Sequence, residues 1–116
     1  MLVSIVIPVF NESKTIFEIL KKVNEIKDFN KEIIIINDGS TDNTKEIIKK
    51  NCSNLYSKFI TYKENKGKGH ACRKGLMQVE GQIVIIQDAD LEYDPNDYSK
   101  LIEPIIKKKS KTHIFL

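Results

Sequence analysis

Apolar residues occur along the chain in short continuous runs that alternate with segments of mixed polarity. A continuous run rich in isoleucine and valine is typical of a strand that is buried on both faces of a sheet. These runs predict strands at residues 2–9, 32–37, 59–62 and 83–87, and a further strand that begins at 113–116.

In the segments between the runs, apolar residues recur every three or four positions, which is typical of a helix that packs one face on a core. This spacing predicts helices at residues 13–27, 42–50 and 71–79, and a fourth that begins at 94–95. Thr15 with Glu18 resembles a capping box for the first helix. Ser40 or Thr41 is placed to cap the second.

Strand and helix alternate four times, which predicts an α/β fold with a mostly parallel sheet and flanking helices. Crossovers between parallel strands are right-handed, so the loops that follow the strands emerge at one edge of the sheet. The length of 116 residues fits a single domain with one core.

Composition limits the setting of the protein. The formal net charge is +3 and most lysines are scattered, so we expect no nucleic-acid partner. Cys52 and Cys72 have no second pair with which to build a metal site, which favours reduced thiols in the cytoplasm. The first residues lack a basic leader, and no apolar run approaches the ~20 residues that span a bilayer. We therefore expect a cytoplasmic protein.

Polar side chains and glycines follow each predicted strand. In open parallel sheets, ligands bind at this edge. Acids there suit a cation or hydroxyl groups, and the loop around Lys68 suits phosphate because backbone N–H groups at a glycine-rich turn attract anions. The organisation favours nucleotide binding over a set of ordinary polar loops. The residues are Asn11, Glu12, Asp38, Lys66, Gly67, Lys68, Gly69, Asp88, Asp90 and Glu92.

The last predicted strand of this series runs directly into Asp88-Ala89-Asp90. Two carboxylates this close repel each other unless a cation lies between them. Oxygen ligands on a short turn suit Mg²⁺ or Mn²⁺, which commonly also contact nucleotide phosphates. Taken alone, the motif fits a solvated acidic turn equally well.

Other phosphate-binding motifs fit poorly. The dinucleotide fingerprint lacks its third glycine, because Cys72 occupies that position, and the chain has no Gly-Lys-Ser or Gly-Lys-Thr. A phosphatase of the haloacid-dehalogenase kind also has Asp-x-Asp after a strand, but it wants Thr or Val where this chain has Glu92. A response-regulator receiver needs paired acids where this chain has Asn11 and Glu12.

Four motifs, in order, resemble family 2 glycosyltransferases, with the closest likeness to the dolichyl-phosphate mannose synthase and polyprenyl-phosphate glycosyltransferase branch. The motifs lie at residues 3–12, 37–42, 65–69 and 87–95 and span essentially the whole chain. The resemblance implies a GT-A-type fold that binds a UDP- or GDP-linked sugar. It places Pro8, Phe10 and Glu12 in the nucleotide pocket and Asp38 against the base.

The resemblance also implies a metal-dependent, inverting transfer. Asp88 and Ala89 would lie at the ribose and diphosphate, and Asp90 and Glu92, together with Asp88, would hold Mg²⁺ or Mn²⁺. A polyprenyl-phosphate acceptor would bring the protein to the inner face of the membrane as a peripheral protein. The resemblance assigns no catalytic base.

The catalytic domain of that family is roughly twice as long as this chain. Residues 1–116 therefore resemble its N-terminal, donor-binding half, and we expect self-association or a complementing chain. A second hypothesis is a non-catalytic module that binds nucleotide-sugars, or an inactive remnant. Both hypotheses predict nucleotide and metal binding, and only the first predicts turnover.

Overall fold

The computed structural model describes residues 1–90, 94–95, 98, 100 and 113–115. Glu92 and most of the predicted fourth helix lie outside these residues. Among the described residues, no helix is long and apolar enough to cross a membrane. Of the described cysteines, Cys52 is buried and Cys72 half-buried, and both are unpaired as predicted.

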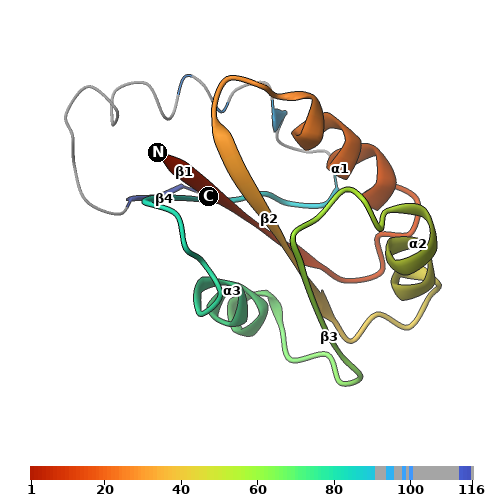
Figure 1. Ribbon diagram of the computed structural model, residues 1–116. Coiled ribbons are helices and arrows are strands. Elements are labelled where there is room, and N and C mark those ends of the chain that lie inside the picture. Colours follow the sequence, from red (N-terminus) through yellow and green to blue (C-terminus); the bar gives the residue numbers. More distant parts are fainter. Residues whose placement is uncertain (91–93, 96–97, 99, 101–112, 116) are drawn as a thin grey trace.

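The described strands form one parallel sheet in the order β3-β2-β1-β4-β5 (Figure 1). β1 pairs with β2 on one side and with β4 on the other, so the first strand of the chain lies at the centre. The parallel α/β architecture predicted from the apolar runs is confirmed. The strands are β1 Leu2–Val9, β2 Asn30–Asp38, β3 Lys58–Tyr62, β4 Ile83–Ile86 and β5 His113–Phe115.

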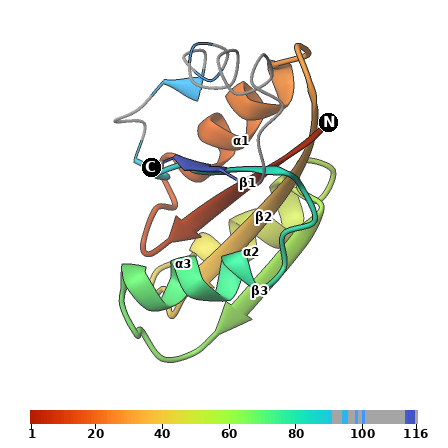
Figure 2. The same ribbon diagram turned by 90° about the vertical axis from the view of Figure 1, so that its left-hand side faces the viewer.

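Helices cover both faces of the sheet (Figures 1 and 2). α1, Ile16–Glu25, and α2, Thr44–Asn51, lie on one face, and α3, Lys68–Leu76, lies on the other. Alternate residues of β1 face the two layers: Ile5 packs in the cluster under α1 and α2, whereas Val6 packs under α3. This period-two burial on both faces explains why the central strands are apolar throughout.

Two predicted caps are wrong. Within the described part of the chain, Thr15 makes no capping hydrogen bond to α1, and its hydroxyl contacts Glu12 and Ala89 instead. At α2, the Ser40 hydroxyl bonds to Asn37, and the carboxylate of Asp42 accepts the Thr44 N–H at 2.9 Å. At α1 a contact between loops replaces the predicted cap, and at α2 a hydrogen bond from Thr44 to the nearby Asp42 replaces it.

α3 begins at Lys68, three positions before the predicted start at residue 71. Gly67 precedes it with φ of 97°, a conformation that glycine adopts without steric penalty. α3 also lies close to the sheet, because a Cβ at Gly75 would lie 2.3 Å from Cγ1 of Val6. The two glycines thus fix where α3 starts and how closely it packs.

A buried polar cluster holds the segment that leads into β4. The Ser4 hydroxyl donates to Oε2 of Glu32 at 2.5 Å, and the Glu80 N–H donates to the same oxygen at 2.6 Å. Lys58 Nζ lies 3.4 Å from Oε1 of Glu32, and the Gly81 N–H donates to Ser4. Burial by itself raises the pKa of Glu32, but these hydrogen bonds and Lys58 outweigh it, and the pKa is lowered overall.

We predict that Glu32→Gln lowers the free energy of unfolding at neutral pH by about 1–3 kcal/mol, because it removes a buried, paired charge. The folded-state pKa is below the ordinary value of 4.5, so the unfolded chain binds more protons between the two values. The contribution is therefore complete above 4.5 and is lost as the pH falls through the lower, folded value. Urea unfolding over a pH series measures this.

Glu46→Gln, on the exposed surface of α2, is the matched control and should leave the pH dependence unchanged. Equal pH dependence in Glu32→Gln and the unchanged protein would contradict the role of Glu32.

Candidate functional site

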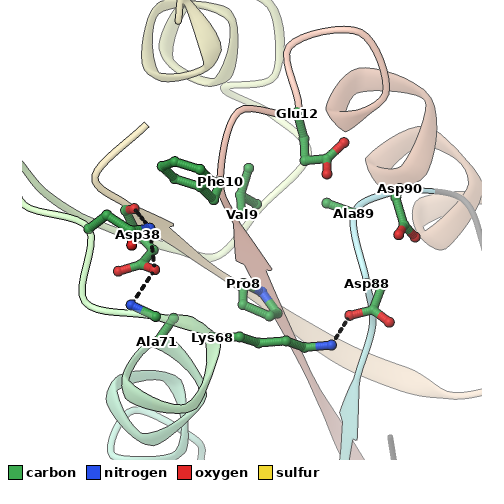
Figure 3. A pocket seen from close by; sticks show the side chains of 12 residues that line it. Pro8, Val9, Phe10, Glu12, Asp38, Lys68, Ala71, Asp88, Ala89 and Asp90 are labelled. Carbon is green, nitrogen blue, oxygen red and sulfur yellow. Dashed lines mark hydrogen bonds and ion pairs between the residues drawn. The ribbon is translucent and has the colours of Figure 1, made fainter. Parts of the chain in front are cut away.

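A cleft of about 370 Å³ opens at the carboxyl ends of β1 and β4 (Figure 3). From β1 the chain first builds β2 and β3 on one side and then crosses to β4 on the other. Open α/β sheets bind ligands where the strand order reverses in this way. The cleft is lined by Pro8, Val9, Phe10, Glu12, Asp38, Asn65, Gly67, Lys68, Ala71, Asp88, Ala89 and Asp90.

Lys68 and every described residue that the resemblance places in the site line this cleft, whereas Asn11, Lys66 and Gly69 from the polar edge do not. Glu92 lies outside the described residues. The cleft also contains Val9, Asn65 and Ala71, which the sequence did not single out individually. Asn65 belongs to a motif that the sequence did single out, whereas Val9 and Ala71 carry no polar signal that would have identified them.

The carboxylate of Asp38 holds the loop between β3 and α3. Its Oδ1 accepts hydrogen bonds from the Tyr62 hydroxyl at 2.7 Å and the Lys66 N–H at 2.9 Å. Its Oδ2 accepts the side-chain amide of Asn65 at 3.0 Å and the Gly67 N–H at 2.9 Å. A carboxylate offers about four acceptor positions, so these donors from the described residues fill it. Asp38 is 3% exposed, and with these bonds it shapes one wall of the cleft.

Tyr62 is suited to this role. Burial and the hydrogen bond to Asp38 raise the pKa of the Tyr62 hydroxyl, so it remains a donor across the physiological range. Gly39 allows the loop to pass close by, because its φ is 64° and a Cβ there would lie 2.3 Å from the backbone nitrogen of Asn65.

Asn11 ties the loop after β1 to the loop after β2. It has φ of 54°, a left-handed conformation that asparagine tolerates better than most residues. Its Oδ1 accepts the Thr41 N–H at 2.7 Å and the Asp42 N–H at 3.2 Å. Its own N–H donates to the Ser40 hydroxyl at 3.0 Å.

Two further contacts bring in the acidic turn, residues 88–90. The Thr15 hydroxyl lies 2.6 Å from the Ala89 carbonyl oxygen. The Lys68 ammonium forms an ion pair with Asp88 across the cleft. The hydrogen bond to Asp88 raises the pKa of Lys68, which keeps this lysine charged. With Lys68 included, each of these loops is bonded to its neighbours, and we call residues 10–15, 38–43, 63–68 and 87–90 the loop ring.

The cleft has two chemically distinct sides (Figure 3). Phe10 and Asp38 lie on one side, and Phe10 is 43% exposed, so an aromatic face is available to a ligand. The acids Glu12, Asp88 and Asp90 lie on the other. A ligand with a planar group at one end and a cation-bound or anionic group at the other would match both sides.

Among the described residues, no group of three His, Cys, Asp or Glu side chains is arranged to hold a metal ion. Mg²⁺ is usually bound by one or two carboxylates together with substrate phosphates and water, not by an all-protein cage. Asp88 and Asp90 supply oxygen ligands of this kind beside the cleft. The donor set therefore fits a metal that arrives with a phosphorylated ligand.

Residues 4–112 match the family described as Glycosyl transferase family 2. The match includes every residue that lines the cleft. The chain belongs to glycosyltransferase family 2. This confirms the family-level resemblance and supports a glycosyltransferase enzyme.

Three known proteins illustrate the relationship. A poly-beta-1,6-N-acetyl-D-glucosamine synthase from Staphylococcus aureus (strain COL) is 43% identical over 94 residues, 81% of this chain and 23% of that protein. S. aureus TarS 1–349 in complex with UDP-GlcNAc gives a TM-score of 0.78 at 28% identity, over 95% of this chain and 32% of that one. The mannosyltransferase PcManGT from Pyrobaculum calidifontis, in complex with GDP-Man and Mn²⁺, gives a TM-score of 0.70 at 29% identity. That match covers 76% of this chain and 27% of PcManGT.

These similarities confirm the α/β fold and its GT-A type. The chain spans only 23% of the length of the synthase it matches. The comparison does not single out the dolichyl-phosphate mannose synthase branch that the motifs resembled, since a polysaccharide synthase and TarS match as well.

We predict that Asp38→Asn destabilises the fold by about 1–3 kcal/mol, because an amide group replaces one acceptor oxygen and faces the N–H donors of the loop. Amide hydrogen exchange at Lys66 and Gly67 should become faster. Tyr62→Phe removes one donor and leaves the other three, so its loss should be near 1 kcal/mol, with Lys66 and Gly67 still protected. Unchanged exchange in Asp38→Asn would refute the loop-holding role.

Proposed function

We propose that this chain binds the nucleotide-sugar donor of a family 2 glycosyltransferase in the cleft between β1 and β4. The observation that carries the proposal is the gathering of Phe10, Lys68 and the acidic turn, from distant parts of the sequence, around one cleft at the reversal of strand order. Family membership supports a nucleotide-sugar as the donor, and the lining of the cleft supports this location for it.

The two sides of the cleft suggest how the donor lies. The nucleoside would stack on the exposed ring of Phe10, near Pro8 and Asp38, and the diphosphate would lie toward Lys68 and Asp88. In this arrangement, Asp38 can accept a hydrogen bond from the base only if it gives up one of the hydrogen bonds that it accepts from the loop. We therefore propose that Asp38 acts mainly by shaping the wall of the cleft.

A UDP-linked N-acetylhexosamine is the donor we propose to test first. A poly-beta-1,6-N-acetyl-D-glucosamine synthase is the 43% identical relative, and TarS was crystallised with UDP-GlcNAc. PcManGT was crystallised with GDP-Man, so GDP-mannose is the comparison.

We propose Asp88, Asp90 and Glu92 as the residues that would hold Mg²⁺ or Mn²⁺. When bound, a divalent ion stabilises negative charge on the diphosphate leaving group. Lys68 would contribute positive charge at the same end of the donor. Its ion pair with Asp88 shows that its ammonium group reaches the acidic turn from α3.

Two acceptors have support. The polysaccharide synthase relative favours a glycan hydroxyl, and the resemblance around the acidic turn favours a polyprenyl phosphate, which would place the enzyme at a membrane surface. The chemistries differ because an ionised phosphate is already nucleophilic, whereas a hydroxyl gains from a general base. Activity, acceptor and location of the whole protein are part of the proposal, because the chain spans 23% of that relative.

We predict that UDP-GlcNAc stabilises the chain in the presence of Mn²⁺, as measured by thermal unfolding. A ligand at ~100 times its dissociation constant adds about 2.7 kcal/mol to the free energy of unfolding. Asp90→Asn should lose the Mn²⁺-dependent part of this stabilisation. Asp28→Asn, the same change in the exposed turn between α1 and β2, should keep it.

The remaining panel contains UDP, GDP and GDP-mannose, each with Mn²⁺ or with EDTA. Stabilisation by the guanosine compounds alone would correct the base and keep the donor-binding proposal. A folded sample that none of these ligands stabilises would refute donor binding by this chain. Turnover by the whole protein would separate an enzyme from a non-catalytic binding module.

A further inference from the structure

The hydroxyl of Thr15 joins two walls of the cleft just before α1 begins. Its Oγ1 lies 2.6 Å from the carbonyl oxygen of Ala89 and 2.9 Å from Oε2 of Glu12. A hydroxyl carries one proton, so it donates to one of these acceptors at a time. The contact with Ala89 spans 74 positions in sequence and is the shorter of the two. Thr15 therefore connects the loop after β1 to the acidic turn.

The neighbouring carbonyl group of the acidic turn is also anchored. The side-chain amide of Gln87 donates to the carbonyl oxygen of Asp88 at 3.0 Å. The Tyr98 hydroxyl in turn donates to Oε1 of Gln87. Gln87 is 2% exposed and Tyr98 is 3% exposed, so this support is inside the core.

Together these contacts fix two consecutive peptide groups. Because a peptide group is planar, an anchored Ala89 carbonyl also fixes the backbone nitrogen of Asp90. The backbone on either side of Ala89 is then held, and with it the directions in which the Asp88 and Asp90 side chains leave the chain. Ala89 itself is 4% exposed and packs in the core cluster that lies under α1 and α2.

We propose that Thr15 is a positioning residue that pre-orients the acidic turn for the metal-bound diphosphate of the donor. This inference rests on the proposed function. Thr15 acts indirectly, because its hydroxyl bonds to the Ala89 carbonyl and not to the carboxylates of Asp88 and Asp90. This hydroxyl is the group that would otherwise cap α1. Groups that orient metal ligands in this indirect way typically affect metal affinity by about 10-fold to 100-fold.

The test compares Thr15→Val, which keeps the shape and removes the hydroxyl, with Thr15→Ser, which keeps the hydroxyl. Thr44→Val is the matched control, because it removes a threonine hydroxyl at the start of α2 that bonds to Asp42. Calorimetry measures the affinity for UDP-GlcNAc and for GDP-mannose, each with Mn²⁺ and with EDTA. We expect Thr15→Val to weaken the Mn²⁺-dependent affinity by about 10-fold or more and to leave the affinity in EDTA unchanged.

Thr15→Ser should restore the Mn²⁺-dependent affinity, and Thr44→Val should keep it even if the variant melts at a lower temperature. A Thr15→Val protein with unchanged Mn²⁺-dependent affinity would overturn the proposal. So would a Thr15→Ser protein as weak as Thr15→Val, since that would assign the effect to packing.

A second measurement separates this proposal from the proposed function. Amide hydrogen exchange at residues 88–90 is measured in the ligand-free proteins. Faster exchange in Thr15→Val, but not in Thr44→Val, upholds the anchoring of the turn even if the unchanged protein binds neither donor. Equal exchange in all the proteins overturns the anchoring, whatever the donor experiments show.

Discussion

The carboxylate of Asp38 accepts hydrogen bonds from Tyr62 and from three residues of the loop between β3 and α3. The geometry of the cleft depends on this arrangement. The loop would otherwise leave its N–H groups to solvent at the end of an edge strand. Held by Asp38, it ends at Gly67 and starts α3 with Lys68 facing the acidic turn. One buried acid therefore sets the position of a cation on a different element.

The strands could be predicted from the sequence because their signal is local. Four consecutive β-branched apolar residues, as in β4, favour a buried strand over other local structures, whatever the rest of the chain does. The site residues could be predicted in part for a related reason, since parallel strands bring the residues that follow them to one edge. Phe10, Asp38 and Asp88 lie between 28 and 78 positions apart in the sequence and still line one cleft.

The interactions that hold the site could not be predicted in the same way. Thr15 reads as a helix cap because capping is a relation between residues three positions apart, whereas its partner Ala89 is 74 positions away. The early start of α3 depends on the backbone conformation of Gly67, which its residue type permits but does not require. Val9 and Ala71 line the cleft through position alone.

The loop ring also has a consequence for how such a chain diversifies. Insertions are usually tolerated in exposed loops, but a residue added between Asn11 and Thr15 would displace bonds to two other loops at once. The turn between α1 and β2, at the opposite edge of the sheet, has no comparable role in the cleft. Length variation among descendants of this sequence should therefore accumulate at that opposite edge, and changes of ligand preference should arise by replacement of side chains within loops of constant length.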